Sequence, residues 1–242
     1  MGVLEYMRGA DTTPTVDVGD AMLPLVIRRH ATARRMTLRL SPDGAEVRVT
    51  MPRWGRTADA IEFARTRTVW LTEQRARVPA RQAVANGATV PFCGRLHRID
   101  WSPKHGRKVQ RDGGMLRLGG PEEAIAARLE RWLRAEATVL MTADLAQYCA
   151  RAALETPRLA LSRANRRWGS CSAKGTVRIN WRLVMAPDTV RRSVVAHEVA
   201  HLLHFDHSPA FHTALADLFE HDIEDANRWL KNEGRTLYSF FG

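Results

Sequence analysis

Residues 193–212 read SVVAHEVAHLLHFDHSPAFH, and this stretch is the most informative about the fold and the chemistry of the chain. His197 and His201 are four residues apart, so a helix places both imidazoles on one face, one turn from each other. Glu198 follows the first histidine and lies beside the two rings. The pattern predicts a helix that presents two ligands to one metal ion, with Glu198 acting as a general base and not as a ligand.

A catalytic zinc ion takes three protein ligands and keeps one open position, so a third donor is needed. We predict His207, because turn-forming residues flank it and can bring the chain back toward the helix. His204 is on the ligand face but nearly two turns from His197, too far along the helix axis to share the ion. The remaining candidates for a third ligand are His212, Glu220 and His221.

Composition places the chain among globular proteins. Its 242 residues suit one large domain or two small ones, and 45% apolar residues can form a core. Cys93, Cys149 and Cys171 are scattered and odd in number, which argues against a disulfide framework and favours a reducing compartment. No run of apolar residues is long enough to cross a membrane, and the N-terminus does not resemble a signal peptide. We therefore expect a soluble, cytoplasmic protein that is not membrane-bound.

The formal net charge is +11, and arginine supplies most of it. An arginine-rich surface can bind phosphate, nucleic acid or an acidic peptide. A GC-rich genome also favours arginine over lysine, and the basic residues are spread along the chain without a recognised nucleic-acid motif. Composition leaves both explanations open.

The N-terminal half is predicted to be rich in strands. Residues 25–52 alternate apolar and polar side chains around the turn sequence Ser41–Gly44, which predicts a hairpin. Residues 57–78 have a helical pattern that Pro79 ends. Residues 87–101 and 115–118 are predicted to be further short strands.

The C-terminal half is predicted to be mainly helical. Residues 121–154 form a long helical pattern, and the metal-binding helix is expected to begin near Pro187. Two strand-like runs, 158–163 and 176–181, are interpreted as a hairpin forming one wall of the cleft before that helix. Short helices are expected over 209–220 and 223–234.

The run RRWGSCSAKGTVRINWRLVMAPDTVRRSVVAHEVAHLLHFDHSPAFH, together with the order of elements before it, resembles the YgjP-like metallopeptidase-domain family, which is related to the SprT and WLM metalloproteases. The resemblance implies an α+β zincin-like fold, zinc held by His197, His201 and His207, and Glu198 as the base. The chain departs from the family pattern at His212, where the family usually has tryptophan, and this affects the expected floor of the pocket.

We expect residues 1–20 to be a flexible lead-in, residues 21–120 a strand-rich part with one helix, and residues 121–242 the zincin-like metal-binding part. The last two parts are expected to form one continuous domain.

Five residues before the metal-binding helix are candidates for binding substrate. Trp168 can line a groove, Ser170 and Asn180 can hydrogen-bond an extended substrate, and Arg166 or Arg167 can bind an acidic group. A structural interpretation competes with this one, because tryptophans on neighbouring strands are often core residues.

The predicted function is hydrolysis by a zinc metallopeptidase with one zinc ion per chain and a peptide or protein substrate. One alternative is a metal-dependent nucleotide (pyro)phosphohydrolase that uses the arginines beside the cleft. Another is a zinc-stabilised binding module that recruits nucleic acid. The sequence does not specify the oligomeric state.

Overall fold

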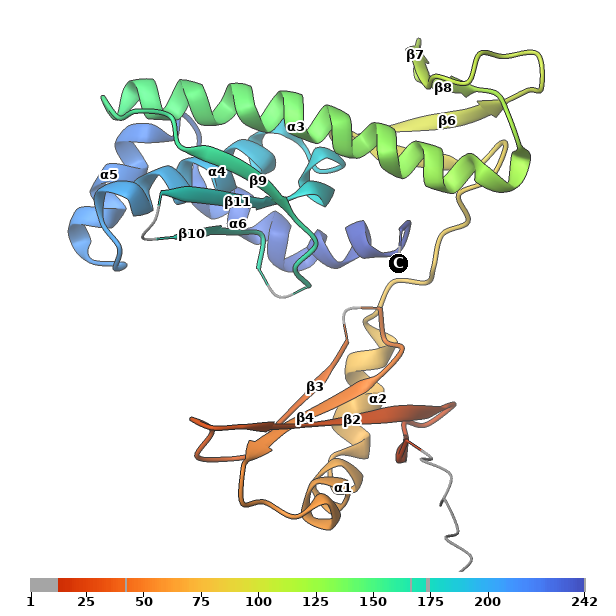
Figure 1. Ribbon diagram of the computed structural model, residues 1–242, viewed down its shortest axis with the longest axis vertical. Coiled ribbons are helices and arrows are strands. Elements are labelled where there is room, and N and C mark those ends of the chain that lie inside the picture. Colours follow the sequence, from red (N-terminus) through yellow and green to blue (C-terminus); the bar gives the residue numbers. More distant parts are fainter. Residues whose placement is uncertain (1–12, 42, 166, 173–174, 242) are drawn as a thin grey trace, which may run out of the picture. The chain divides into compact units, whose positions relative to one another are not determined.

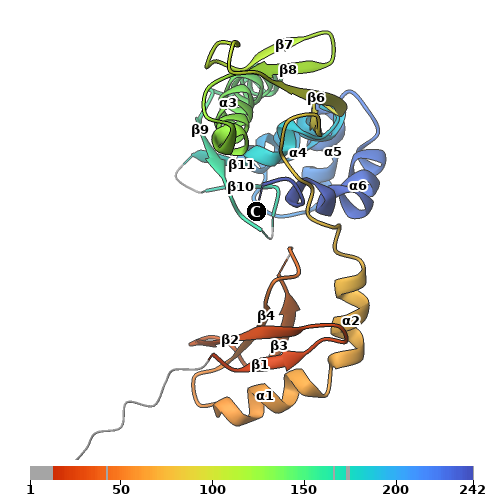
Figure 2. The ribbon, with the colours of Figure 1, turned by 90° about the vertical axis from the view of Figure 1, so that its right-hand side faces the viewer.

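The computed structural model describes residues 13–41, 43–165, 167–172 and 175–241 (Figures 1 and 2). The chain forms two compact units, Met1–Pro79 and Ala80–Gly242. The sequence pattern places the main change at residue 120 instead. The strands between Pro79 and residue 120 belong with the C-terminal helices, because Val90 and Leu116 lie in the same core as Leu129.

The N-terminal unit is a four-stranded sheet with two helices. Its elements are β1 (Thr15–Asp17), β2 (Met22–His30), β3 (Thr37–Leu40), β4 (Val47–Pro52), α1 (Thr57–Arg65) and α2 (Thr68–Ala76). The strand order is β1-β2-β4-β3. Alternate residues of β2 and β4, among them Leu25, Val47 and Val49, share a core with Ala60 of α1 and Leu71 of α2. Both helices therefore cover one face of the sheet.

Three local features of this unit differ from the sequence-based expectations. The predicted hairpin is formed by β3 and β4 alone, while β2 pairs with β4 in parallel. The expected lead-in contains β1, and residues 1–12 lie outside the described structure. The predicted helix over residues 57–78 is two helices, because Thr66 and Thr68 bond their hydroxyls back to the carbonyls of Phe63 and Arg65 at the break.

The C-terminal unit contains two small sheets with strand orders β5-β6-β8-β7 and β10-β11-β9. Its strands are β5 (Thr89–Phe92), β6 (Arg95–Trp101), β7 (Gln110–Asp112), β8 (Met115–Leu118), β9 (Arg158–Ser162), β10 (Gly169–Cys171) and β11 (Thr176–Asn180). Its helices are η1 (Glu122–Ala124), α3 (Ile125–Arg151), η2 (Trp181–Val184), α4 (Asp188–Leu203), α5 (Pro209–Leu218), α6 (Ile223–Asn232) and η3 (Gly234–Tyr238). The fold is α+β, as the sequence predicts.

The long helix α3 is the support on which the site is built, and it runs along α4 in Figure 1. Leu129, Leu133, Ala137 and Met141 recur every fourth residue and are fully buried. A buried ion pair fixes α4 to α3, with Arg191 Nε donating to Asp144 Oδ2 at 2.8 Å. Buried charges are tolerated when they are paired, so the pair fixes which face of α4 meets α3.

The strands before α4 form a hairpin, but not the predicted one. β10 and β11 are antiparallel, whereas β9 and β11, the two runs expected to pair as a hairpin, are parallel. β10 is an edge strand of this sheet. Among the described residues, no helix is long and apolar enough to cross a membrane.

Candidate metal centre

The predicted helix and turn bring three histidines together. His197 and His201 lie one turn apart on α4, which ends at Leu203 because His204 adopts an extended conformation with φ −138° and ψ 113°. The chain then turns, and α5 begins at Pro209. His207 lies in this turn, and one potential ligand nitrogen from each of the three rings lies within 4.8 Å of the others.

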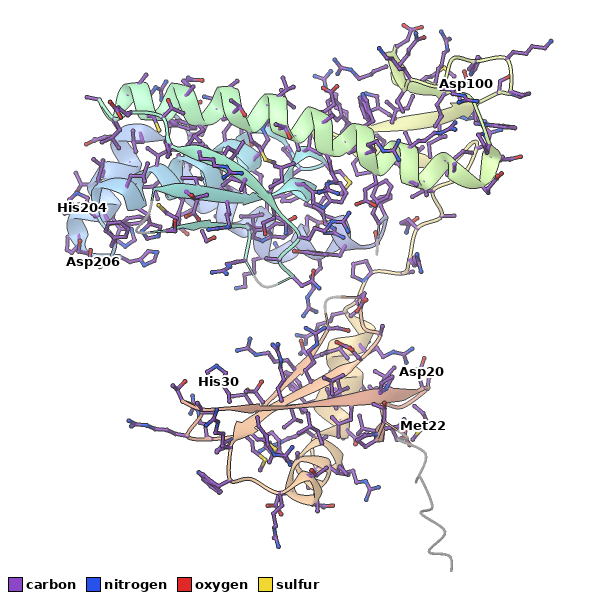
Figure 3. The ribbon with its side chains drawn as sticks, in the orientation of Figure 1. Asp20, Met22, His30, Asp100, His204 and Asp206 are labelled. Carbon is purple, nitrogen blue, oxygen red and sulfur yellow. The ribbon has the colours of Figure 1, made fainter. Side chains whose placement is uncertain are left out.

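The turn has its own local support. The Asp206 carboxylate accepts a hydrogen bond from the backbone N–H of Ser208 at 3.3 Å, which closes a small loop around His207. Figure 3 labels His204 and Asp206 in this turn. His201 Nδ1 lies 3.1 Å from the His204 carbonyl oxygen, so this nitrogen carries the proton and donates it. Its Nε2 is then the nitrogen left for a metal.

Phe211 forms the floor beneath the three imidazoles. It is fully buried, and its ring centroid lies 5.0 Å from that of His197, 4.6 Å from that of His201 and 4.7 Å from that of His207. Sequence reasoning missed this role of Phe211. Its position four residues after His207, on the helix that follows the turn, is the signal that could have placed it there.

The charge state of His197 suits metal binding. Burial, with the neighbouring His201 and His207, lowers the pKa of His197 to about 4. The ring is therefore neutral at neutral pH, which is the form that ligates a metal. Three imidazoles grouped in this way match the donor set of a catalytic zinc site.

Glu198 follows His197 on α4, and its side chain is buried. It is 5% exposed, and Oε2 is buried without a hydrogen-bond partner among the described residues. Burial raises the pKa of Glu198 to about 7, although the charge of Arg167 and the backbone of Cys171 act in the opposite direction. A buried carboxylate with one unused oxygen fits a group that exchanges protons with a reacting molecule.

Gly169 brings the edge strand β10 against Glu198. A Cβ atom on Gly169 would collide with Glu198 Oε1 and would lie 2.7 Å from Cγ and 2.8 Å from Cδ. The lack of a side chain therefore lets the strand and the carboxylate approach closely.

Residues 34–233 match the family described as YgjP-like, metallopeptidase domain. The chain belongs to the YgjP-like family. A comparison with curated proteins gave no match. The match spans most of the chain and includes the helix α4 and the turn that carries His207. Membership of this metallopeptidase family supports a metal-dependent hydrolase, and the three histidines form a group that can hold its metal ion.

The five predicted substrate-binding residues of this YgjP-like chain have different surroundings. Arg167 is exposed and close enough to lower the pKa of Glu198, whereas Arg166 lies outside the described residues. Ser170 is opposite Arg178 on the face of β10 that alternates away from Gly169 and Glu198. Of these residues, Arg167 is the one whose charge acts on Glu198.

Trp168 and Asn180 are occupied by contacts within the protein. The Trp168 ring packs on Tyr238 with centroids 5.5 Å apart. Asn180 is fully buried, and its amide nitrogen donates to the Ala164 carbonyl at 2.8 Å and to the Tyr238 hydroxyl at 3.0 Å. Its amide oxygen accepts from the backbone of Arg182. The Asn180 amide is therefore engaged within the protein, Trp168 is half-buried against Tyr238, and their substrate contacts stay predictions.

The rival metal ligands lie outside the group. Glu220 accepts from the Tyr148 hydroxyl at 2.9 Å and pairs with Arg151 and Arg192. His212 is exposed, with its ring centroid 6.5 Å from that of His207. His204 and His221 are likewise not members of the group.

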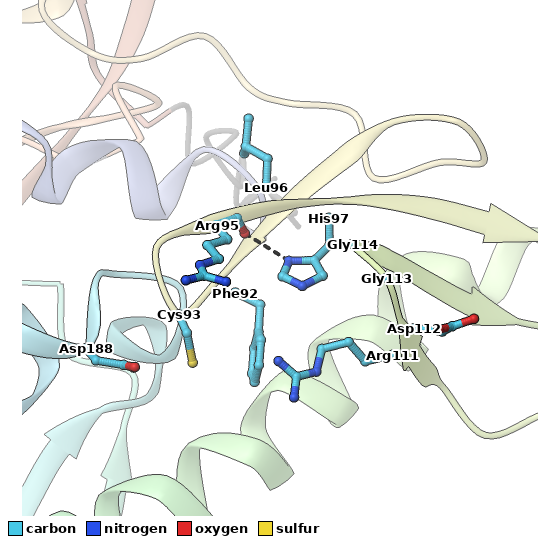
Figure 4. Close-up of a pocket in the computed structure, with 10 residues that line it drawn as sticks. All are labelled: Phe92, Cys93, Arg95, Leu96, His97, Arg111, Asp112, Gly113, Gly114 and Asp188. Carbon is cyan, nitrogen blue, oxygen red and sulfur yellow. Dashed lines mark hydrogen bonds between the residues drawn. The ribbon is translucent and has the colours of Figure 1, made fainter.

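A separate pocket of about 620 Å³ lies at the other end of α4 (Figure 4). The hairpins β5–β6 and β7–β8 line it together with Asp188, the first residue of α4, roughly 20 Å along the helix from His201. Burial, with the charge of Asp188, raises the pKa of the Cys93 thiol in this pocket to about 11. The thiol stays protonated at neutral pH, which argues against a nucleophilic role for Cys93.

Proposed function

We propose that this chain is a zinc-dependent peptidase that binds one zinc ion through His197, His201 and His207 and uses Glu198 as its general base. The observation that carries the proposal is the group of three imidazoles, one nitrogen of each lying within 4.8 Å of the others. Glu198 follows the first of these histidines on α4, and its buried Oε2 has no hydrogen-bond partner among the described residues. The family supports metal-dependent hydrolysis, while zinc, the roles of these residues and peptide cleavage are our inference.

Zinc fits the donor set because three imidazole ligands leave one position open for chemistry. When bound, zinc would supply a Lewis acid that polarises the substrate carbonyl and makes a water molecule more acidic. The Phe211 floor and the hydrogen bond from His201 Nδ1 to the His204 carbonyl keep the ligand rings oriented before the metal arrives.

Glu198 is proposed to move the proton. Its Oε2 accepts a proton from the attacking water as the water oxygen bonds to the carbonyl carbon, and the same carboxyl then delivers this proton to the leaving nitrogen as the C–N bond breaks. Burial supports this role, because it raises the pKa of Glu198 to about 7. A carboxyl with such a pKa can both accept and release a proton near neutral pH.

A peptide is favoured as the substrate by the position of β10. This edge strand lies against Glu198 through Gly169 and pairs with only one strand, β11, in its sheet. An extended peptide can hydrogen-bond to a free strand edge with its main chain, whatever its sequence. Such a peptide would pass beside the Glu198 carboxylate.

The test is cleavage of a mixture of synthetic peptides by the zinc-loaded chain, followed by mass spectrometry. We expect the wild-type protein to cleave peptides. In Glu198→Gln, the cleavage rate should fall about 10²–10⁴-fold, because the general base is removed. Metal content should be equal in the two proteins, since Glu198 is not a ligand. His204→Ala is the matched control, because it alters a histidine of the same turn that lies outside the metal group.

Nucleotide hydrolysis is the outcome that would contradict the peptidase proposal. The arginines near the cleft motivate that alternative, but Arg163 pairs with Glu130 at 2.6 Å. Phosphate or pyrophosphate release from nucleotides that depends on Glu198, without cleavage of any peptide, would keep the metal site and reject the peptide substrate.

A further inference from the structure

The N-terminal unit has a sheet face that its own helices leave open. The residues of β2 and β4 that alternate with the buried Leu25, Val47 and Val49 point away from α1 and α2. We call this surface the open sheet face and define it by six residues: Arg28, His30, Thr37, Arg39, Arg48 and Thr50. It is rich in cations and hydroxyl groups, and none of the six carries a carboxylate.

The strand register places the cations side by side. Arg39 of β3 is directly opposite Arg48 of β4, and Arg28 of β2 is opposite Thr50, two residues further along β4. Like charges directly opposite each other on neighbouring strands destabilise a sheet. The pairing of Arg48 with Glu46 offsets part of this repulsion, and Arg39 is left to bind an anion from outside the protein.

The charges of this face are only partly balanced within the protein. Arg48 pairs with Glu46. Arg28 and Arg39 have no carboxylate partner among the residues that the structure describes, and both are exposed. Two cations of the face, on the strands that flank β4, thus remain free to bind phosphate or carboxylate oxygens.

An exposed aromatic ring lies at one end of the same sheet. Trp54 is 82% exposed and closely follows β4, whose last residue Pro52 is opposite His30. Figure 3 labels His30 at this end of β2, and Figure 1 shows the connection from β4 to α1 at the same end. Arg53, beside the tryptophan, is exposed as well. A tryptophan in water without packing partners is suited to stacking on a flat ring.

We propose that the open sheet face and Trp54 form a binding surface for single-stranded nucleic acid. Arg28 and Arg39 bind phosphates along the strand, and Trp54 stacks on an unpaired base, which a base-paired duplex does not offer. The cations together with the exposed tryptophan favour nucleic acid over an acidic peptide. An acidic peptide could pair with the arginines but offers Trp54 no base to stack on. The proposal is independent of the metal centre, because every residue in it belongs to the N-terminal unit.

The test uses the full-length chain and a fluorescently labelled single-stranded oligonucleotide, with anisotropy measured over a range of salt concentrations. In the double variant Arg28→Gln/Arg39→Gln, we expect weaker binding and a salt slope that falls by about 0.7 for each phosphate that the variant no longer neutralises. Trp54→Ala should weaken binding about tenfold and leave the salt slope unchanged, because stacking releases no counterions.

Two controls separate this surface from general basicity and from the active site. Arg56→Gln removes an exposed arginine that pairs with Asp59 at 3.1 Å and lies outside the open sheet face, so binding should be unchanged. Glu198→Gln should also bind normally, whatever it does to hydrolysis. The substituted side chains of the N-terminal unit are exposed, and unchanged thermal unfolding would confirm that the variants fold.

Absence of oligonucleotide binding at low salt would overturn the proposal, as would equal affinities for wild type and the variants. Binding that depends on the arginines but not on Trp54, and that heparin or an acidic peptide reproduces, would identify a general anion surface. That result would also reject the assignment to single-stranded nucleic acid.

Discussion

Replacing Gly169 by alanine tests the tightest packing in the candidate site. The added Cβ would lie 2.7 Å from Glu198 Cγ and 2.8 Å from Cδ, well inside ordinary contact distance. Glu198 is 5% exposed, so its side chain has little room to move away. Overpacking of this kind typically costs about 1–3 kcal/mol of folding free energy. For a unit of this size, that corresponds to a decrease in melting temperature of roughly 2–12 °C.

The loss of activity should exceed what the loss of stability explains. A shift of the base by about 1 Å can reduce the rate about 10²-fold, and the three histidines should still retain the metal. The assay compares peptide cleavage, zinc content and thermal unfolding with those of Gly106→Ala. Gly106 is the matched control, because a Cβ there meets nothing within 4 Å. Wild-type cleavage and melting temperature in Gly169→Ala would refute the inferred contact between β10 and Glu198.

Three further predictions concern the surroundings of the site. Phe211→Ala removes the fully buried floor under the histidines. It should lower the free energy of unfolding, measured by chemical denaturation, by about 3–5 kcal/mol and weaken zinc retention. A decrease below about 1 kcal/mol would show that the floor does not support the fold. Asp144→Asn removes one of the two carboxylates that pair with the buried Arg191, while Asp188 remains, and should cost about 1–3 kcal/mol, whereas an unchanged denaturation midpoint would show that the pair does not fix α4. Because the pKa of Cys93 is raised to about 11, its alkylation by iodoacetamide should be slow at pH 8 and should accelerate up to about pH 11, as followed by mass spectrometry. Rapid labelling of Cys93 at pH 8 would contradict this shift.

Local sequence signals locate the candidate site well. The four-residue spacing of His197 and His201 places both on one face of α4, and the turn residues around His207 bring it back to the same point. These features depend on helix periodicity and on a short turn, both of which are encoded within a few residues. The boundaries of α3, α4 and α5 follow from proline and apolar patterns for the same reason.

Long-range features are not predictable in the same way. The alternation of β9 and β11 indicates that they are strands, but alternation does not specify whether two strands pair in parallel or antiparallel. The approach of Gly169 to Glu198 joins segments with no common local pattern. The hydrogen bonds that bury the Asn180 amide likewise depend on Tyr238 near the end of the chain, so the sequence alone suggests a substrate contact where the structure has an internal one.

The division at Pro79 illustrates a further limit. Apolar strand residues such as Val90 and Leu116 need a buried face, and the sequence does not state which sheet or helix provides it. They pack with Leu129 of α3 in the C-terminal unit, so the boundary follows the core and not the change from strands to helices.

Bound metal is the measurement that tests the central claim most directly. Protein purified without metal-affinity resin and incubated with zinc is dialysed and analysed for elemental content as wild type, His207→Ala, His204→Ala and Glu198→Gln. We predict about one zinc ion per chain in wild type, retained in His204→Ala and Glu198→Gln and lost in His207→Ala. No zinc in wild type, or equal zinc in His207→Ala, would contradict the three-histidine site.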